Sequence, residues 1–184
     1  MISWLLIAIL SYFFFSLASL GDKLILSNVP KPNLYTFYMG ALGALAIFLI
    51  PFLKFDMPDT TTMIWIILEA IVYIAGLYTM FRALEKFEAS KIMTTIGAAQ
   101  PLFVLFLAWF FWGLQTITGV KIFAFFLLLA GSIIISINKK SDKTKGYIIA
   151  TILPSLFFSL DYIFQKIVFS SQPFLQGFVW MKMA

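Results

Sequence analysis

Two acidic residues lie inside long apolar segments of this sequence, where an ionisable side chain could do chemistry. Asp161 is followed one helical turn later by Gln165, with mostly apolar neighbours. Carboxylates at membrane depth pair with a cation, bind an ion or relay protons, because an isolated charge in lipid is costly. We therefore expect Asp161 either to titrate during transport or to form a structural ion pair, for example with Lys166. Glu69 lies closer to the start of its segment, and we expect it to be interfacial and solvated.

Two rows of hydroxyl and lysine side chains have matching spacing. Positions i, i+4, i+7 and i+11 share one face of a helix. The first row consists of Tyr12, Ser16, Ser19 and Lys23. The second row consists of Ser155, Ser159, Tyr162 and Lys166. Such rows could line two walls of a polar cavity. Alternatively, the hydroxyls could hydrogen-bond between packed helices, while the lysines reach the nearest headgroups.

A third candidate site surrounds a proline within an apolar segment. Thr94, Gly97 and Pro101 share one helix face, and Gln100 precedes the proline. Proline has no backbone N–H, so the carbonyl one turn earlier, that of Gly97, loses its partner. The segment could present this acceptor to a substrate or bend there as a hinge. A tolerated kink without a functional role is the alternative.

Composition excludes several other classes of site. The chain contains no cysteine and no histidine, which excludes disulfides, Cys/His metal sites and histidine acid–base catalysis. No nucleotide-binding loop or nucleophile motif is present, so we do not expect an enzyme. The excess of 13 Lys and Arg over 8 Asp and Glu lies mostly between apolar segments. There it is typical of membrane topology signals rather than of nucleic-acid binding.

These residues must be positioned by helices that cross a lipid bilayer. Of the 184 residues, 62% are hydrophobic and 11% charged, and the mean hydropathy is +1.00. A span needs about 20 apolar residues. The sequence predicts six spans, at about 1–20, 34–53, 62–84, 90–112, 116–137 and 146–169. A seventh apolar segment begins at Phe174 and is only half a span long at the last residue, Ala184, so we expect a truncated all-α polytopic helix bundle.

The sequence also contains an internal repeat. At an offset of 143 residues, 9–28 aligns with 152–171 and eight of the 20 positions are identical, including Lys23 with Lys166. The repeating unit holds five predicted spans, an odd number, so a second copy enters the membrane from the opposite face. Inverted repeats are an architecture of secondary transporters. We predict a first repeat at 1–138, a basic loop at 139–145 and a partial second repeat at 146–184.

Three stretches resemble the EamA-type transporters of the drug/metabolite transporter superfamily. They are Gly76–Ser90 (GLYTMFRALEKFEAS), Ile96–Gly113 (IGAAQPLFVLFLAWFFWG) and Gly119–Ile135. One departure is Leu114 after Gly113, where the family often has glutamate. The resemblance implies a carrier of small organic solutes or metabolites that works by alternating access, without a cofactor. It implies neither the substrate nor the coupling proton or ion.

The distribution of basic residues predicts an orientation in the cytoplasmic membrane. One predicted face carries Lys31, Arg82, Lys86, Lys91, Lys139, Lys140, Lys143 and Lys145. The opposite face carries Lys54 and Lys121. The positive-inside rule places the face with more bases in the cytoplasm and the N-terminus outside, whereas relatives are usually described with both termini inside. A membrane scaffold or assembly subunit without transport activity is the alternative function.

Overall fold

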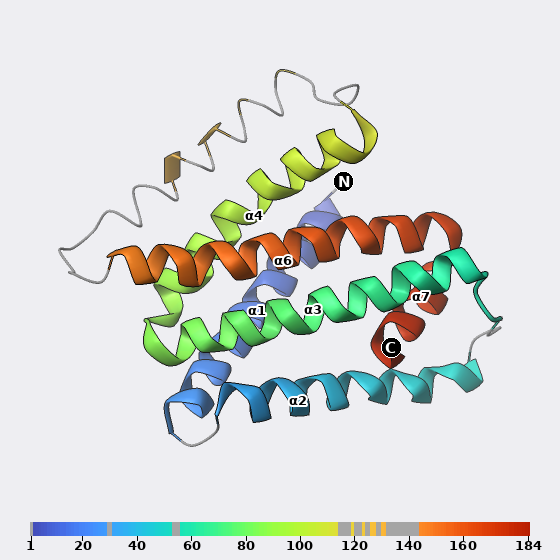
Figure 1. Cartoon of the computed structure of the whole chain (residues 1–184), viewed down its shortest axis with the longest axis horizontal. Coiled ribbons are helices and arrows are strands. Elements are labelled where there is room, and N and C mark those ends of the chain that lie inside the picture. The colour runs from blue at the N-terminus through green and yellow to red at the C-terminus, as the bar shows by residue number, and fades with distance from the viewer. Residues whose placement is uncertain are drawn as a thin grey trace.

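The computed structural model of the chain describes residues 2–28, 31–52, 56–113 and 144–184, with a few single positions between 119 and 131. All regular elements in these ranges are helical (Figure 1). In chain order they are α1 (Ile2–Asn28), α2 (Pro32–Gly43), the 3₁₀ helix η1 (Ala44–Phe52), α3 (Thr60–Lys86), α4 (Ala89–Trp112), α6 (Thr144–Ser171) and α7 (Phe174–Met183).

Among the described residues, five helices are long and apolar enough to cross a membrane. They cover Leu5–Ser27, Pro32–Phe52, Thr60–Lys86, Ala89–Trp112 and Ile149–Ser171. The predicted all-α polytopic membrane fold and five of its six spans are therefore confirmed. The predicted span at 116–137 and the basic loop after it lie largely outside the described residues, and the division into two repeats stays a prediction.

The ends of the helices follow from local chemistry. Asp59 caps α3, because its Oδ2 accepts hydrogen bonds from the backbone N–H groups of Thr61 (3.2 Å) and Thr62 (3.3 Å). These bonds and one from the Thr62 hydroxyl lower the pKa of the Asp59 carboxyl, since they stabilise its charged form. Gly113 ends α4 with φ of 77°, a conformation that costs glycine little.

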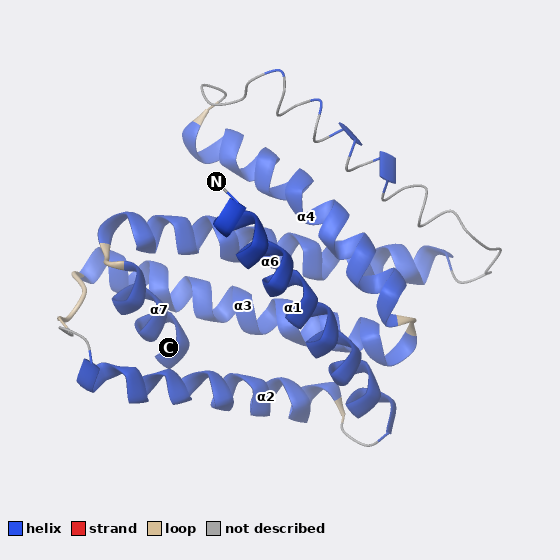
Figure 2. Cartoon of the chain, turned by 180° about the vertical axis from the view of Figure 1, so that it is seen from behind, coloured by secondary structure: helices blue, strands red, loops and turns tan. Residues whose placement is uncertain are grey.

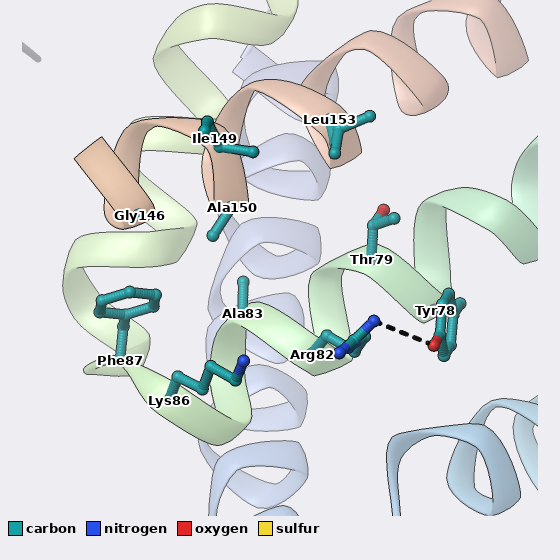
Figure 3. Close-up of a pocket in the computed structure, with 10 residues that line it drawn as sticks. All are labelled: Tyr78, Thr79, Arg82, Ala83, Lys86, Phe87, Gly146, Ile149, Ala150 and Leu153. Atoms are coloured by element: carbon teal, nitrogen blue, oxygen red, sulfur yellow. Dashed lines mark hydrogen bonds between the residues drawn. The ribbon is translucent and has the colours of Figure 1, made fainter. Parts of the chain in front are cut away.

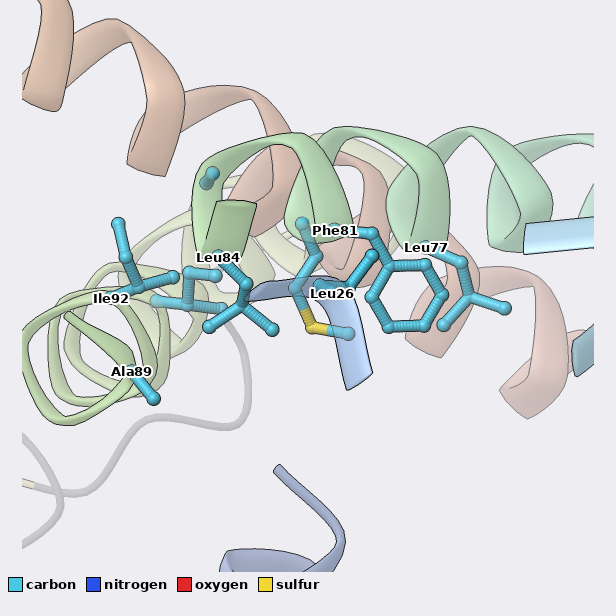
Figure 4. Close-up of a cluster of buried hydrophobic side chains, with 9 residues drawn as sticks. Leu26, Leu77, Phe81, Leu84, Ala89 and Ile92 are labelled. Carbon is cyan, nitrogen blue, oxygen red and sulfur yellow. The ribbon is translucent and has the colours of Figure 1, made fainter. Parts of the chain in front are cut away.

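The closest packing lies between α3 and α6. A Cβ atom added to Gly76 would lie 3.0 Å from the Phe158 ring, so only glycine lets the two helices approach this closely. A second set of buried side chains joins the end of α3 to α1 and α4 (Figure 4). Its members are Leu26, Leu77, Met80, Phe81, Ala83, Leu84, Ala89, Ile92 and Ile96.

Successive helices run back and forth along the long axis of the molecule (Figure 1). Helix α1 lies obliquely across one face of the bundle (Figure 2), where it contacts α3 and α4. Along the long axis, α1 and α6 run in opposite senses (Figure 1). Opposite senses are what an inverted repeat requires of its first and sixth helices.

Helix α7 folds back against the bundle after a short turn. Trp180 Nε1 donates a hydrogen bond of 3.2 Å to the Asp56 carbonyl oxygen, which lies just before α3. A Cβ atom on Gly177 would lie 3.1 Å from the Phe169 ring of α6. These contacts bring the end of α7 beside α3 and η1.

Candidate functional site

The site with the most functional chemistry is a pair of buried carboxyl groups between α3 and α6. Glu69 is 1% exposed and Asp161 is 5% exposed. Gln165 donates from Nε2 to both oxygens of Asp161, at 3.1 Å each, and to Oε1 of Glu69 at 3.4 Å. The two carboxyl groups therefore lie on the same amide nitrogen. One amide thus joins two acids from different helices.

Both acids lie near the middle of the apolar core. Glu69 is nine residues from the start of α3 at Thr60, about 14 Å at 1.5 Å per residue. Asp161 is ten residues before the end of α6 at Ser171, about 15 Å. A bilayer core is about 30 Å thick. The expectation that Glu69 is interfacial and solvated is therefore wrong, because α3 starts well before it and α6 covers it.

The pair of carboxyl groups can hold a shared proton. Oε2 of Glu69 is buried and receives no hydrogen bond from an N–H or O–H group in the described part of the chain. Two buried carboxylates on one amide donor repel each other, and a proton on one of them removes this repulsion. A proton on either acid supplies the missing donor.

Lys182 of α7 supplies a cation near this site. Its Nζ lies 3.7 Å from the centre of the Tyr73 ring of α3, and Tyr73 is one helical turn after Glu69. Gly43 of α2 lies beside its aliphatic chain, since a Cβ added there would be in ordinary contact with Lys182 Cδ at 3.7 Å. One lysine and two acids that share one proton carry no net charge, which suits a site in lipid.

The predicted pairing of Asp161 with Lys166 is not what holds this site. The ammonium group of Lys166 lies 4.3 Å from the centre of the Trp112 ring at the end of α4, and Asp161 accepts hydrogen bonds from Gln165. Asp161 and Lys166 are five residues apart, so they point in different directions from the helix. Asp161 is therefore linked to Glu69 of α3 through Gln165.

The first predicted row does not form a cavity wall in the described part of the chain. Tyr12 is 74% exposed, and Ser16 donates to the Tyr12 carbonyl oxygen of its own helix (2.8 Å). Ser19 is buried and donates to the Phe15 carbonyl oxygen (2.8 Å). Lys23 donates to the Leu84 carbonyl oxygen in the last turn of α3, where a cation also complements the helix dipole.

The second row divides between two surroundings. Ser155 and Ser159 are fully buried; Ser155 donates to the Thr151 carbonyl oxygen of its own helix (2.6 Å). Ser159 donates to Ser155 O at 2.6 Å and lies 3.0 Å from the carbonyl oxygen of Gln100 in α4. Tyr162 is 58% exposed. No hydrogen bond recorded for these side chains joins this row to the first row, so helix contact explains the serines better than a shared cavity does.

The proline region of α4 is a contact with α6 rather than a separate site. Helix α4 continues through Pro101, and the Gln100 carbonyl oxygen receives the Ser159 hydroxyl. Thr94 donates to the Ser90 carbonyl oxygen of its own helix (2.6 Å). Gly97 is exposed. The role predicted for its carbonyl oxygen, as an acceptor for a substrate, stays a prediction.

Comparison with known proteins agrees with this bundle. The model of the EamA-like transporter family matches residues 2–137. The chain belongs to the EamA-like transporter family. No curated protein and no solved structure matches the chain. Family membership makes the chain a multi-pass membrane transporter protein rather than a member of an enzyme family.

The match to the EamA-like transporter family covers only part of the carboxyl site. It includes Glu69 and Tyr73, whereas Asp161, Gln165 and Lys182 lie beyond residue 137. Sequence reasoning identified Asp161 and Gln165 but missed the role of Glu69 and the contribution of Lys182. Lys182 lies in the short last helix, and only the fold brings that helix back beside α3.

Proposed function

We propose that this EamA-like protein is a secondary transporter of small organic solutes or metabolites that works by alternating access across the cytoplasmic membrane. The observation that carries this proposal is the buried Glu69–Asp161 pair at the α3–α6 contact. Helix α3 belongs to the first predicted repeat and α6 to the second. Binding sites of transporters with inverted repeats lie near the membrane midplane, where the repeats meet.

The chemistry of the pair supports a proton as the coupling ion. With Lys182 charged, the site is neutral when the two acids hold one proton, and it becomes charged when a proton is gained or lost. Movement of α3 against α6 would separate Glu69 from Asp161 and break the bonds of Gln165 to one of them. The acid left without its partner would then be a solvated carboxyl that exchanges its proton with the aqueous phase on the open side.

Proton flux in proteoliposomes tests this proposal. Vesicles containing trapped pyranine, a pH-sensitive dye, are mixed with a panel of amino acids and nucleosides, and the internal pH is followed. We expect at least one solute to drive proton movement with the wild-type protein. Glu69→Gln and Asp161→Asn each keep the shape of the acid but cannot release a proton, and we expect both to reduce the flux to that of empty vesicles.

The matched control is Glu85→Gln, which changes an exposed acid at the end of the same helix, α3. We expect it to leave the flux unchanged. Solute-driven proton flux at the wild-type rate in both Glu69→Gln and Asp161→Asn would contradict proton coupling through this pair.

The alternative of a membrane scaffold without transport activity has one observation in its favour. The four serines of the two rows donate to the backbone of their own helices, and Tyr12 and Tyr162 are exposed. Such rows suit contacts with other helices. If the protein inserts normally in the vesicles and no solute of the panel is transported, the result favours this alternative.

A further inference from the structure

A pocket with a basic rim lies between the end of α3 and the start of α6, away from the buried carboxyl pair. Its cavity volume is about 290 Å³, near the lower end of the range of small-molecule sites. The α3 side supplies the polar groups and the α6 side supplies an apolar wall (Figure 3). The residues around it are Tyr78, Thr79, Arg82, Ala83, Lys86, Phe87, Gly146, Ile149, Ala150 and Leu153.

The polar side of the pocket is suited to an anion. Arg82 and Lys86 are both exposed, and no acidic residue is among the described residues that line the pocket. Arg82 Nη1 donates to the Tyr78 hydroxyl oxygen at 3.3 Å, which holds the guanidinium group beside the pocket (Figure 3). The Tyr78 hydroxyl hydrogen is left to donate to a ligand. Phosphate oxygens are the usual partners of such a set of donors.

The opposite side of the pocket is suited to hydrocarbon. Ile149 is 62% exposed and Leu153 is 41% exposed, and with Ala150 they form the α6 wall. From Lys86 at the end of α3 to Tyr78 the pocket spans eight residues, about 12 Å of depth. It therefore extends from the membrane surface into the apolar layer. A soluble anion would contact only the basic side chains of α3, whereas a lipid would contact these and the apolar wall of α6 as well.

We propose that this pocket binds the phosphate headgroup of an anionic phospholipid, with the first part of an acyl chain against α6. The pocket lies on the membrane face that carries Lys31 and Lys91 as well, the face predicted to be cytoplasmic. Basic pockets between membrane helices on that side bind anionic headgroups. The pocket shares no residue with the carboxyl site, and lipid binding there can be measured without transport.

Native mass spectrometry of the full chain tests the proposal. The protein in detergent is incubated with equal amounts of phosphatidylglycerol and phosphatidylcholine, and the bound lipids are counted. Two basic residues near a membrane surface predict a preference for the anionic lipid of about 30-fold. In Arg82→Gln/Lys86→Gln we expect this preference to disappear.

The control is Lys31→Gln/Lys91→Gln, which removes the same charge from the same face outside the pocket, where Lys91 already pairs with Glu88 at 2.9 Å. We expect this variant to keep the preference. An equal loss in the control would show general surface attraction and overturn the proposal. Displacement of the bound lipid by soluble glycerol phosphate at equal concentration would identify a free-anion site and would also overturn it.

Discussion

Helices α3 and α6 differ from α1 in what they do with their polar residues, although all three are apolar enough to span a membrane. In an apolar 18-residue stretch of α3 and of α6, 39% of the residues are buried, against 6% in that of α1. The buried acids of α3 and α6 share one donor, Gln165 of α6, so this set of hydrogen bonds joins the two helices. Ser16 and Ser19 of α1 donate to the backbone of their own helix.

This difference shows that a polar residue in a span is informative only together with its surroundings. A serine can satisfy its hydroxyl within its own helix, by donating to the carbonyl four residues earlier. A carboxyl group in the middle of a helix has no free backbone N–H in that helix, so it needs a side-chain donor, which Gln165 supplies to Asp161 and to Glu69. Buried acids therefore mark the helix contact where function is expected, and serine rows do not.

The largest difference in stability is expected between variants of two lysines, Lys182 near the carboxyl pair and Lys23 in α1. Lys182→Met removes the cation beside the carboxyl pair, and we expect it to lower stability at alkaline pH by up to about 3 kcal/mol, because a buried charge is then left uncompensated. The loss should shrink as the pH falls and the pair takes up a proton. Lys23→Met in α1 removes one charged hydrogen bond, and we expect about 1.5 kcal/mol with little pH dependence.

Unfolding of both lysine variants in detergent at several pH values checks this. Equal pH profiles for the two variants would show that Lys182 has no special relation to the acids.

Close packing is expected to give the next largest contrast. Gly76→Val places a branched side chain where even a Cβ atom would be 3.0 Å from the Phe158 ring, and we expect a loss of about 1–3 kcal/mol from overpacking. Gly21→Val in α1 is the matched control, because no atom lies within 4 Å of its added Cβ. Thermal unfolding of the two variants measures the difference, and equal midpoints would contradict the close α3–α6 contact.

Serines should give a smaller contrast. Ser159→Ala removes a hydroxyl that reaches the Gln100 carbonyl oxygen across the α4–α6 contact, and we expect a loss of about 0.6 kcal/mol, typical of hydrogen bonds between membrane helices. Ser16→Ala removes a bond within α1 and should leave stability unchanged. Chemical unfolding in mixed micelles is sensitive enough to compare them; a larger loss for Ser16→Ala would mean that α1 is packed more closely than the structure shows.

The smallest effect is expected at the start of α3, outside the membrane core. Hydrogen bonds from Thr62 and Thr61 lower the pKa of Asp59 from its ordinary value of 3.8. The charged form is thus favoured by folding, so its contribution is complete above the ordinary pKa and is lost as the pH falls through the lowered value. Asp59→Asn should abolish this acid-dependent part of stability, measured by unfolding between neutral and acid pH. Asp56→Asn, which changes an acid that is not the helix cap, should preserve it.

The predicted spans and the observed helices agree closely where the apolar pattern is continuous. The predicted spans 62–84 and 90–112 match α3 and α4 to within two residues at each end, because lipid requires every backbone group to be bonded within the helix. The end of α1 was predicted too early, at residue 20, because Asp22 and Lys23 were taken to end the span. Both are instead held within the helix, by Tyr35 and by the Leu84 carbonyl oxygen.

The functional residues were predicted less evenly than the helices. Asp161 and Gln165 stood out because carboxyl and amide groups are rare in such apolar surroundings. The depth of Glu69 was misjudged because distance from a helix end does not say which neighbour covers the side chain. The two rows have different neighbours: in α1, Tyr12 is exposed while Lys23 reaches the end of α3, and in α6 the Ser159 hydroxyl lies against α4.

The sequence by itself determined that this chain is a membrane protein, which of its segments can cross the bilayer, and that the chain belongs to the EamA-like transporter family. These properties depend on composition and on the length of each apolar segment, because the thickness of the hydrocarbon core sets how many apolar residues a span needs. Only the tertiary structure decided that Gln165 joins Glu69 to Asp161 and that Lys182 lies against Tyr73, one turn from Glu69. Their meeting depends on the rotation of α3 and α6 about their axes, on the absence of a side chain at Gly76 and on the return of α7, because contacts across helices are set by packing rather than by spacing in the sequence.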